Sequence, residues 1–143
     1  MKIYYTPNKD TVFFNGKFTS KKKTFPSYAF SSAFSGCTNL TSVSFPNLTS
    51  AEASAFYFGF SSNNYLTSVS FPELTSVGGS TFSYAFSGCT NLTSVSFPKL
   101  TSAKSGAFNY IGHSNLTIHV PSSLSSAGLS TDGSEYGTIV YDL

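Results

Sequence analysis

Two cysteines and two histidines are the side chains of this sequence best suited to chemistry. Cys37 and Cys89 each stand in the phrase Gly-Cys-Thr-Asn-Leu, and the corresponding positions elsewhere hold Asn63 and His113. A thiol beside an imidazole can form an activated thiolate nucleophile, and thiolate and imidazole groups also bind zinc. The first candidate for a catalytic or metal-binding site is therefore the line formed by Cys37, Asn63, Cys89 and His113.

The surroundings of this line favour a structural role. No third group accompanies Cys89 and His113 to orient the imidazole, and two cysteines and one histidine in a single line cannot surround a metal ion. The six carboxylates are scattered along the chain, so no pair of acids is placed for proton transfer. We expect small buried thiols, no enzymatic activity, no metal and no cofactor.

An internal repeat positions these residues. The phrase Leu-Thr-Ser-Val-Ser-Phe-Pro occurs three times, and a shorter relative stands at Leu116–Pro121. The period is about 26 residues, which lies within the range of leucine-rich repeats, and the last step is slightly shorter. Spacing of the type Leu-x-x-Val-x-Phe is the pattern of a leucine-rich solenoid, in which these three side chains point inward and those between them face solvent.

Stacked turns align the inward residues into three columns. Each turn alone buries too little apolar surface to fold, so its neighbours must complete the core. The columns are Leu40, Leu66, Leu92 and Leu116; Val43, Val69, Val95 and Ile118; and Phe45, Phe71, Phe97 and Val120.

The sequence thus predicts a mainly β fold, a right-handed leucine-rich repeat solenoid of about four turns with a β-hairpin cap and a C-terminal cap. We divide it into an N-terminal cap at 1–24, repeats at 25–127 and a C-terminal cap at 128–143. Asn15-Gly16 is a strong hairpin signal. Within the caps we expect strands over Ile3–Thr6, Thr11–Phe14, Lys17–Thr19 and Thr138–Tyr141, and a helical turn over Pro121–Gly128.

The same register predicts no disulfide between Cys37 and Cys89. They stand two full periods apart in the sequence. At a strand spacing of about 4.8 Å their backbones should lie about 10 Å apart. A disulfide needs Cα atoms within about 7 Å.

The repeat resembles the BspA-like leucine-rich repeat family of bacterial surface proteins. The resemblance rests on Ala-Phe-Ser-Gly-Cys-Thr-Asn-Leu, at 33–40 and 85–92, with the strand that ends in proline, and it covers roughly 25–127. The chain departs from the family's usual isoleucine before the repeat prolines, where it has Phe45, Phe71 and Phe97, and at positions 51 and 103, where it has alanine. The resemblance implies an extracellular or cell-surface adhesion module that binds a protein or glycan on a host or neighbouring cell.

Composition and charge argue against two other classes of function, nucleic-acid binding and membrane insertion. Six of the eight lysines lie between Lys2 and Lys23 and no basic face continues beyond them, so we expect no nucleic-acid binding. No stretch approaches the roughly 18 apolar residues that span a bilayer, so we expect no membrane insertion. Residues 1–7 contain no apolar h-region, so we expect no export signal there. A structural or receptor-contacting component of a phage or prophage particle is therefore the alternative function.

Residues that break the repeat are better candidates for function than residues that obey it. Tyr57, Phe58 and Tyr65 stand largely where other turns have serine or asparagine. Three aromatic side chains in the turn of residues 52–77 predict an apolar patch for protein or carbohydrate contact. The alternative is that the rings cover a gap beside Gly59.

The outward face of the strands is the second candidate surface. Extended solenoid faces are common binding surfaces. Only His119 distinguishes one turn of this face from the next, so a merely solvated sheet is the alternative. Besides Thr41, Ser42 and Ser44, the candidate residues are Thr67, Ser68, Ser70, Thr93, Ser94, Ser96 and His119.

Overall fold

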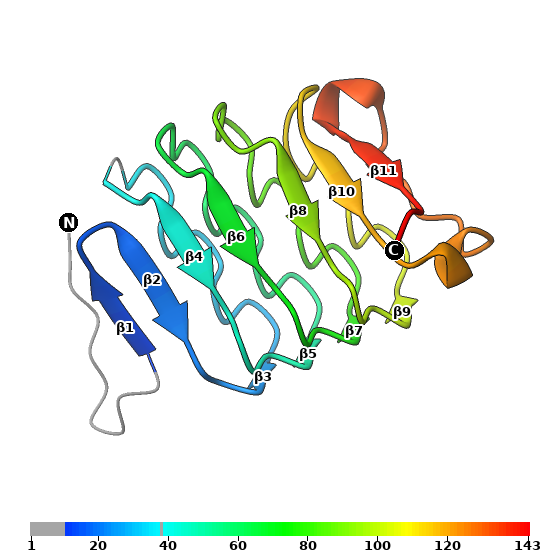
Figure 1. Cartoon of the computed structure of the whole chain (residues 1–143), viewed down its shortest axis with the longest axis horizontal. Helices are drawn as coiled ribbons and strands as arrows, with labels where there is room; N and C mark the ends of the chain where they lie inside the picture. Colours follow the sequence, from blue (N-terminus) through cyan, green and yellow to red (C-terminus); the bar gives the residue numbers. More distant parts are fainter. Residues whose placement is uncertain (1–10, 38) are drawn as a thin grey trace.

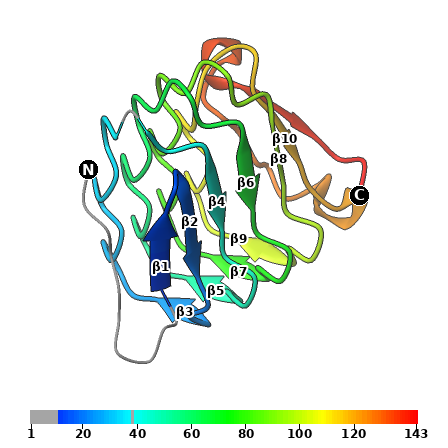
Figure 2. The same ribbon diagram turned by 60° about the vertical axis from the view of Figure 1, so that its left-hand side comes forward.

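In the computed structural model, which describes residues 11–37 and 39–143, the chain winds around one axis (Figure 1). Its stacked turns form three faces. The back face consists of tight turns without regular strands. The front face holds the parallel strands β2 (Lys17–Ser20), β4 (Ser42–Ser44), β6 (Ser68–Ser70), β8 (Ser94–Ser96) and β10 (Thr117–His119). The lower face, which meets the front face at a corner (Figure 2), holds β3 (Thr24–Phe25), β5 (Ser50–Ala51), β7 (Ser76–Val77) and β9 (Ser102–Ala103).

A β-hairpin closes the N-terminal end of the front face. β1 (Thr11–Phe14) runs antiparallel to β2, and the connecting residues Asn15 and Gly16 adopt φ values of 52° and 78°. Positive φ at both central residues is what a type I′ turn requires, so the hairpin predicted from Asn-Gly is confirmed. The strand predicted over Ile3–Thr6 lies outside the described residues.

The C-terminal cap adds one strand and two short helices. β11 (Thr138–Val140) pairs in parallel with β10 and confirms the closing strand, one residue shorter than predicted. The helical turn predicted over Pro121–Gly128 is only a 3-10 helix, η1 (Ser122–Leu124), because serines flank its one buried residue and compete for backbone hydrogen bonds. A second 3-10 helix, η2 (Ser134–Tyr136), was not predicted. Within the described ranges, no helix has the length and apolar character needed to carry the chain across a membrane.

Strand pairing confirms the period read from the sequence. β4 pairs in parallel with β6, which places Val43 beside Val69, and β8 pairs with β10, which places Val95 beside Ile118. β6 and β8 lie next to each other without a hydrogen-bonded ladder, so the front face consists of the two sheets β1-β2-β4-β6 and β8-β10-β11. The chain is the mainly β solenoid of about four turns that the sequence predicts.

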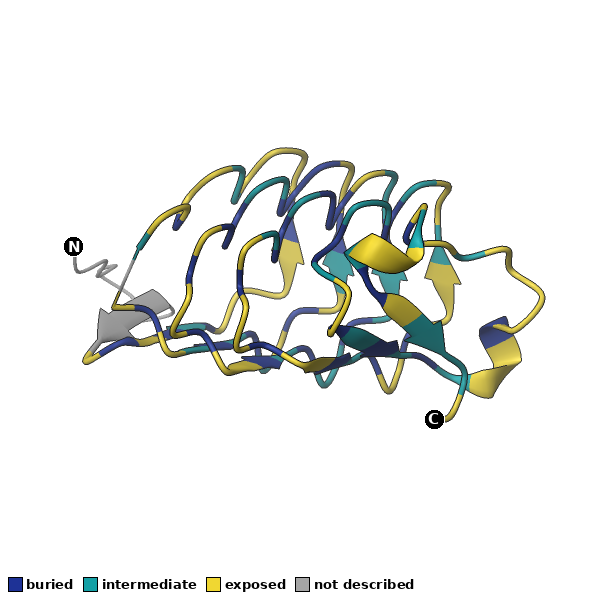
Figure 3. Ribbon diagram, turned by 90° about the horizontal axis from the view of Figure 1, so that it is seen from above, coloured by how far each residue is buried: buried dark blue, intermediate teal, exposed yellow. Residues whose placement is uncertain are grey.

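The three predicted columns form the core. Their twelve members are at most 8% exposed, and Figure 3 shows buried segments recurring in successive turns. Phe71 stacks on Phe45 and on Phe97, with ring centroids 5.1 and 5.3 Å apart. A second set of phenylalanines packs inward from the back face, and among them Phe82 stacks on Phe56 at 5.3 Å. Ring stacking therefore connects each turn to the next.

Tight turns on the back face impose an unusual backbone conformation. The Ser31 N–H donates to Tyr28 O, three residues earlier, whereas the Ser32 N–H donates to Tyr57 O in the next turn of the solenoid. This alternation brings every fourth residue to positive φ, a region that favours glycine and is uncommon for bulky side chains. The aromatic residues that adopt it are Tyr28, Phe58, Tyr84 and Tyr110.

Candidate binding surfaces

Cys89 lies in the predicted line of chemical side chains, but its thiol is not activated. It is fully buried, and its Sγ donates to Phe60 O at 3.0 Å. Burial raises the pKa of Cys89 to about 11, and a hydrogen bond with the Asn63 backbone offsets this only in part. A nucleophilic cysteine needs the opposite shift. The thiol therefore stays protonated at neutral pH.

His113 does not form the dyad with Cys89 that the spacing allowed. Its Nε2 lies 2.9 Å from Leu92 O, and its Nδ1 accepts a hydrogen bond from Asn115 N at 3.3 Å. Both ring nitrogens thus make hydrogen-bonding contacts with backbone groups rather than with the Cys89 thiol. Cys37 is half-buried and, like Cys89, a free cysteine. In the part of the chain that the structure describes, no three metal-binding side chains come together.

Asn63 stands in this line at the position where two other turns have a cysteine, and its side chain connects two turns. Its Nδ2 donates to Phe34 O at 2.8 Å and to Phe60 O at 2.7 Å. Its Oδ1 is buried and has no hydrogen-bond partner in the structure. The side chain thus joins its own turn to the turn that holds Cys37, and the line as a whole has a packing role.

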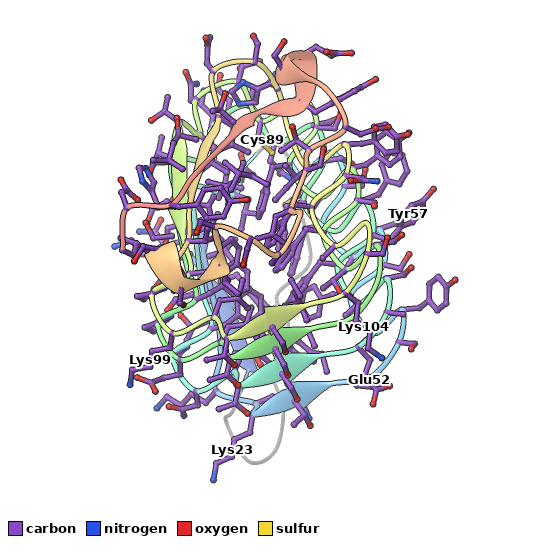
Figure 4. The ribbon with its side chains drawn as sticks, turned by 90° about the vertical axis from the view of Figure 1, so that its right-hand side faces the viewer. Lys23, Glu52, Tyr57, Cys89, Lys99 and Lys104 are labelled. Atoms are coloured by element: carbon purple, nitrogen blue, oxygen red, sulfur yellow. The ribbon has the colours of Figure 1, made fainter. Side chains whose placement is uncertain are left out.

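Tyr57 and Phe58 belong to a continuous row of rings on the back face. Phe58 stacks on Tyr84 with centroids 4.6 Å apart and planes 6° from parallel, and Tyr84 stacks on Tyr110 at 5.1 Å. Tyr57 meets Phe58 edge to face at 4.8 Å, and Tyr136 meets Tyr110 in the same way at 4.9 Å. We call these five residues the aromatic strip. Figure 4 shows Tyr57 at the outer edge of the back face.

The aromatic strip is partly open to solvent. All five side chains are half-buried. The Asp132 carboxylate accepts a hydrogen bond from the Tyr110 hydroxyl and raises the pKa of Tyr110, which joins the strip to the C-terminal cap. Gly59 does not border a gap, because a Cβ there would lie 3.0 Å from Phe56 O and 3.1 Å from Phe30 O.

Tyr65 lies apart from the aromatic strip. It stands in the loop before β6, its side chain is 63% exposed, and it makes no ring contact with another described residue. The structure therefore brings two of the three predicted aromatic residues together and leaves the third on a different part of the surface. The three tyrosines that complete the strip were missed, although they follow Phe58 at the period of the repeat.

The predicted hydroxyl face lies on the solvent side of the front strands. Its described residues are exposed or half-buried. His119, the one residue that distinguishes a turn, is within hydrogen-bonding distance of Asp142, with Nδ1 2.9 Å from Oδ2. The Thr67 hydroxyl donates to Thr41 O at 3.3 Å. The ring and this hydroxyl are thus engaged within the chain.

Comparison with known proteins identifies the repeat. The family model described as BspA type leucine-rich repeat region, in six copies, matches residues 12–131. No curated protein and no solved structure matches the chain. Leucine-rich repeats of this kind are generally non-enzymatic scaffolds of the protein-binding or adhesion type. The chain therefore belongs to the BspA type leucine-rich repeat family, as its repeated phrases predict.

Proposed function

We propose that this chain is a non-enzymatic adhesion module of a bacterial surface or secreted protein, and that its aromatic strip captures a partner on a host or neighbouring cell. The supporting observation is the stack of Phe58, Tyr84 and Tyr110 on the outer side of the back face. All three rings occupy positive φ, which costs about 1–2 kcal/mol per residue. Ser32 completes the same turn without a ring, so folding alone does not require aromatic residues there.

The orientation of the rings favours a protein partner over a glycan. Sugars stack on open ring faces, but the faces of Tyr84 are covered by Phe58 and Tyr110. The edges of the rings and the hydroxyl group of Tyr84 are left for contact. Tyrosine and phenylalanine supply contact area at a low entropic cost, and tyrosine adds a hydrogen-bonding group. Such anchors typically dominate the binding energy of a protein interface.

Adhesion of coated beads to cultured host cells tests this function. Beads that carry the parent chain should bind, and protease treatment of the cells should remove more binding than glycosidase treatment. The double variant Tyr57→Ser/Phe58→Ser should reduce binding at least about tenfold. Tyr28→Ser is the matched control, because Tyr28 also has positive φ, is 64% exposed and makes no ring contact with another described residue. Failure of the parent beads to adhere, or equal adhesion by the double variant, would refute the proposal.

A further inference from the structure

We infer that a groove at the corner between the lower face and the back face binds an extended segment of a partner polypeptide, one that carries a basic and an acidic side chain three residues apart. The groove begins as a hollow of about 490 Å³ that crosses four successive turns, from Ser27 to Lys104. A second hollow of about 330 Å³ continues from Lys104 to Asp132 along the C-terminal cap. This site is separate from the aromatic strip and does not rest on it.

Two consecutive glycines open the floor of the groove. Gly78 and Gly79 stand where the neighbouring turns have Glu52-Ala53 and Lys104-Ser105. A Cβ on Gly78 would lie 2.5 Å from Ala53 N, so no other residue fits. Gly79 is less constrained, because a Cβ there would lie 3.2 Å from Ser105 O and its φ is not positive. The absence of a side chain at 79 therefore keeps the floor open and avoids a close contact with Ser105 O.

Thr81 fixes this floor in place. Its buried Oγ1 lies 2.6 Å from Gly78 O and 3.2 Å from Glu52 O, so one hydroxyl bridges two turns. The other turns have alanine at the equivalent positions 29, 55 and 107. Three departures from the repeat, at 78, 79 and 81, thus shape one feature. Coinciding departures of this kind are expected at functional sites.

Opposite charges stand at the two sides of the glycine floor. Glu52 and Lys104 are exposed, belong to turns on either side of Gly78, and lie on the same corner of the solenoid (Figure 4). Two turns at about 4.8 Å each separate their backbones by about 10 Å. Glu73 and Lys99, one turn apart, form a salt bridge at 2.8 Å. No salt bridge joins Glu52 or Lys104 to another described residue, so both charges are available to a ligand.

A polypeptide matches these features better than a glycan. Acidic glycans carry charges of one sign, whereas a ligand here must present a cation to Glu52 and an anion to Lys104. In a polyproline II segment, residues three apart point to the same side and lie about 9 Å apart, which fits the two-turn separation. The N–H groups of Ala53 and Gly79 make no hydrogen bond within the described chain. They are free to bond the carbonyl groups of such a segment.

Titration of the 15N-labelled full chain with capped eight-residue peptides tests this site by NMR. The probes carry one lysine and one aspartate three residues apart, in both orders, and a comparison peptide has the same composition with the two charges adjacent. One order of the spaced pair should shift the amide signals of Ala53, Gly79 and Ser105 and bind at least about fivefold more tightly than the comparison peptide. Added salt should weaken this binding.

Charge exchange gives the sharper test. The variant Glu52→Lys/Lys104→Glu should prefer the opposite order of the two charges. The control variant Glu73→Lys/Lys99→Glu exchanges a charge pair outside the groove and should keep the parental preference. Absence of shifts with every probe at millimolar concentration, equal affinity for adjacent charges, or an unchanged preference after the exchange would each overturn the inference.

Filling the groove separates this site from the aromatic strip. Ala53→Trp should abolish the peptide shifts, whereas Ala33→Trp places the same ring on an exposed alanine outside the groove and should not. The strip variant Tyr57→Ser/Phe58→Ser should bind the peptides as the parent does. If Ala53→Trp leaves peptide binding intact, the groove is not the site. If the strip variant loses the peptides, the two surfaces are not separate.

Discussion

Phe45 and Phe71 are one repeat apart in the sequence, and their rings stack with planes 8° from parallel and centroids 5.1 Å apart. The contact joins two residues that are 26 positions apart in the chain, and Phe97 continues the stack on the other side. Phe71 is therefore enclosed by its own column and, at 1% exposure, has no route to solvent. Its neighbour Ser70 is the last residue of β6 and is half-buried on the opposite face.

This enclosure predicts unequal effects of two adjacent truncations. Phe71→Ala should lower the free energy of unfolding by about 3–5 kcal/mol, because the surrounding rings cannot close the cavity. Ser70→Ala should stay within about 0.5 kcal/mol of the parent, because its side chain has no packing role. Urea denaturation of both variants measures the difference. Equal losses would contradict the inward and outward assignment of the strand.

Alkaline pH should unfold the chain in part through Cys89. The folded-state pKa of Cys89, about 11, lies above the ordinary value of 9.0. The contribution of the neutral thiol to the free energy of unfolding is therefore fully present below pH 9 and is lost as the pH rises through 11. The loss should reach about 2–3 kcal/mol. Cys89→Ala should be less stable than the parent at pH 7 and should lose less stability between pH 9 and 11. Parallel alkaline losses in the two proteins, from denaturant titrations, would refute this.

Thiol reactivity should differ between the two cysteines. Half-buried Cys37 should react with a disulfide reagent in the native protein, whereas Cys89 should react only after unfolding. The unfolded, unreduced chain should then show two thiols, because two turns separate the residues beyond the reach of a disulfide. Absence of free thiol in the unreduced monomer would show that the register is wrong.

Glycine should stabilise one position on the back face. Ser62 has φ of 60° and stands in line with Gly36 and Gly88, which have φ of 70° and 76°. Ser62→Gly removes the cost of a side chain at positive φ and should raise the free energy of unfolding by about 0.5–1 kcal/mol. Ser87→Gly, where φ is not positive, is the control and should lower it by a similar amount. Thermal melts of both variants measure these changes. A Ser62→Gly variant that is not more stable than the parent would contradict the positive φ described for this back-face turn.

Much of the fold was predictable because inward side chains repeat at a fixed spacing along a strand. Val43 and Phe45 are both buried and flank an outward serine, so their period of two is visible in the sequence. The lower face was not predicted, because strands such as Ser50–Ala51 are too short to show any alternation. The back-face turns were not predicted either, since tyrosine at positive φ contradicts local preference.

The candidate sites were predictable only where a residue differs from its counterparts. Phe58 was predicted as a site residue because Ser32 occupies the same position one turn earlier. Tyr110 was not predicted, because it is identical to its counterpart Tyr84. Tyr65 was grouped wrongly with Phe58, because position within a turn does not say which face a side chain occupies. Gly78 was missed because a glycine reads as a turn signal, and its close approach to the preceding turn is visible only in three dimensions.

The most direct test of the proposed function compares the two parts of the predicted aromatic patch in one experiment. Tyr57→Ser/Phe58→Ser removes two rings of the strip, and Tyr65→Asn removes the isolated ring. We expect the double variant to lose about 1–3 kcal/mol of stability from its ring contacts but to remain folded, and to lose the partners that the parent binds on a host-protein array. Tyr65→Asn should keep both its melting temperature and those partners. A folded double variant that binds the same proteins as the parent would contradict the proposed function, and a double variant that is unfolded at the assay temperature would show that the rings serve the fold.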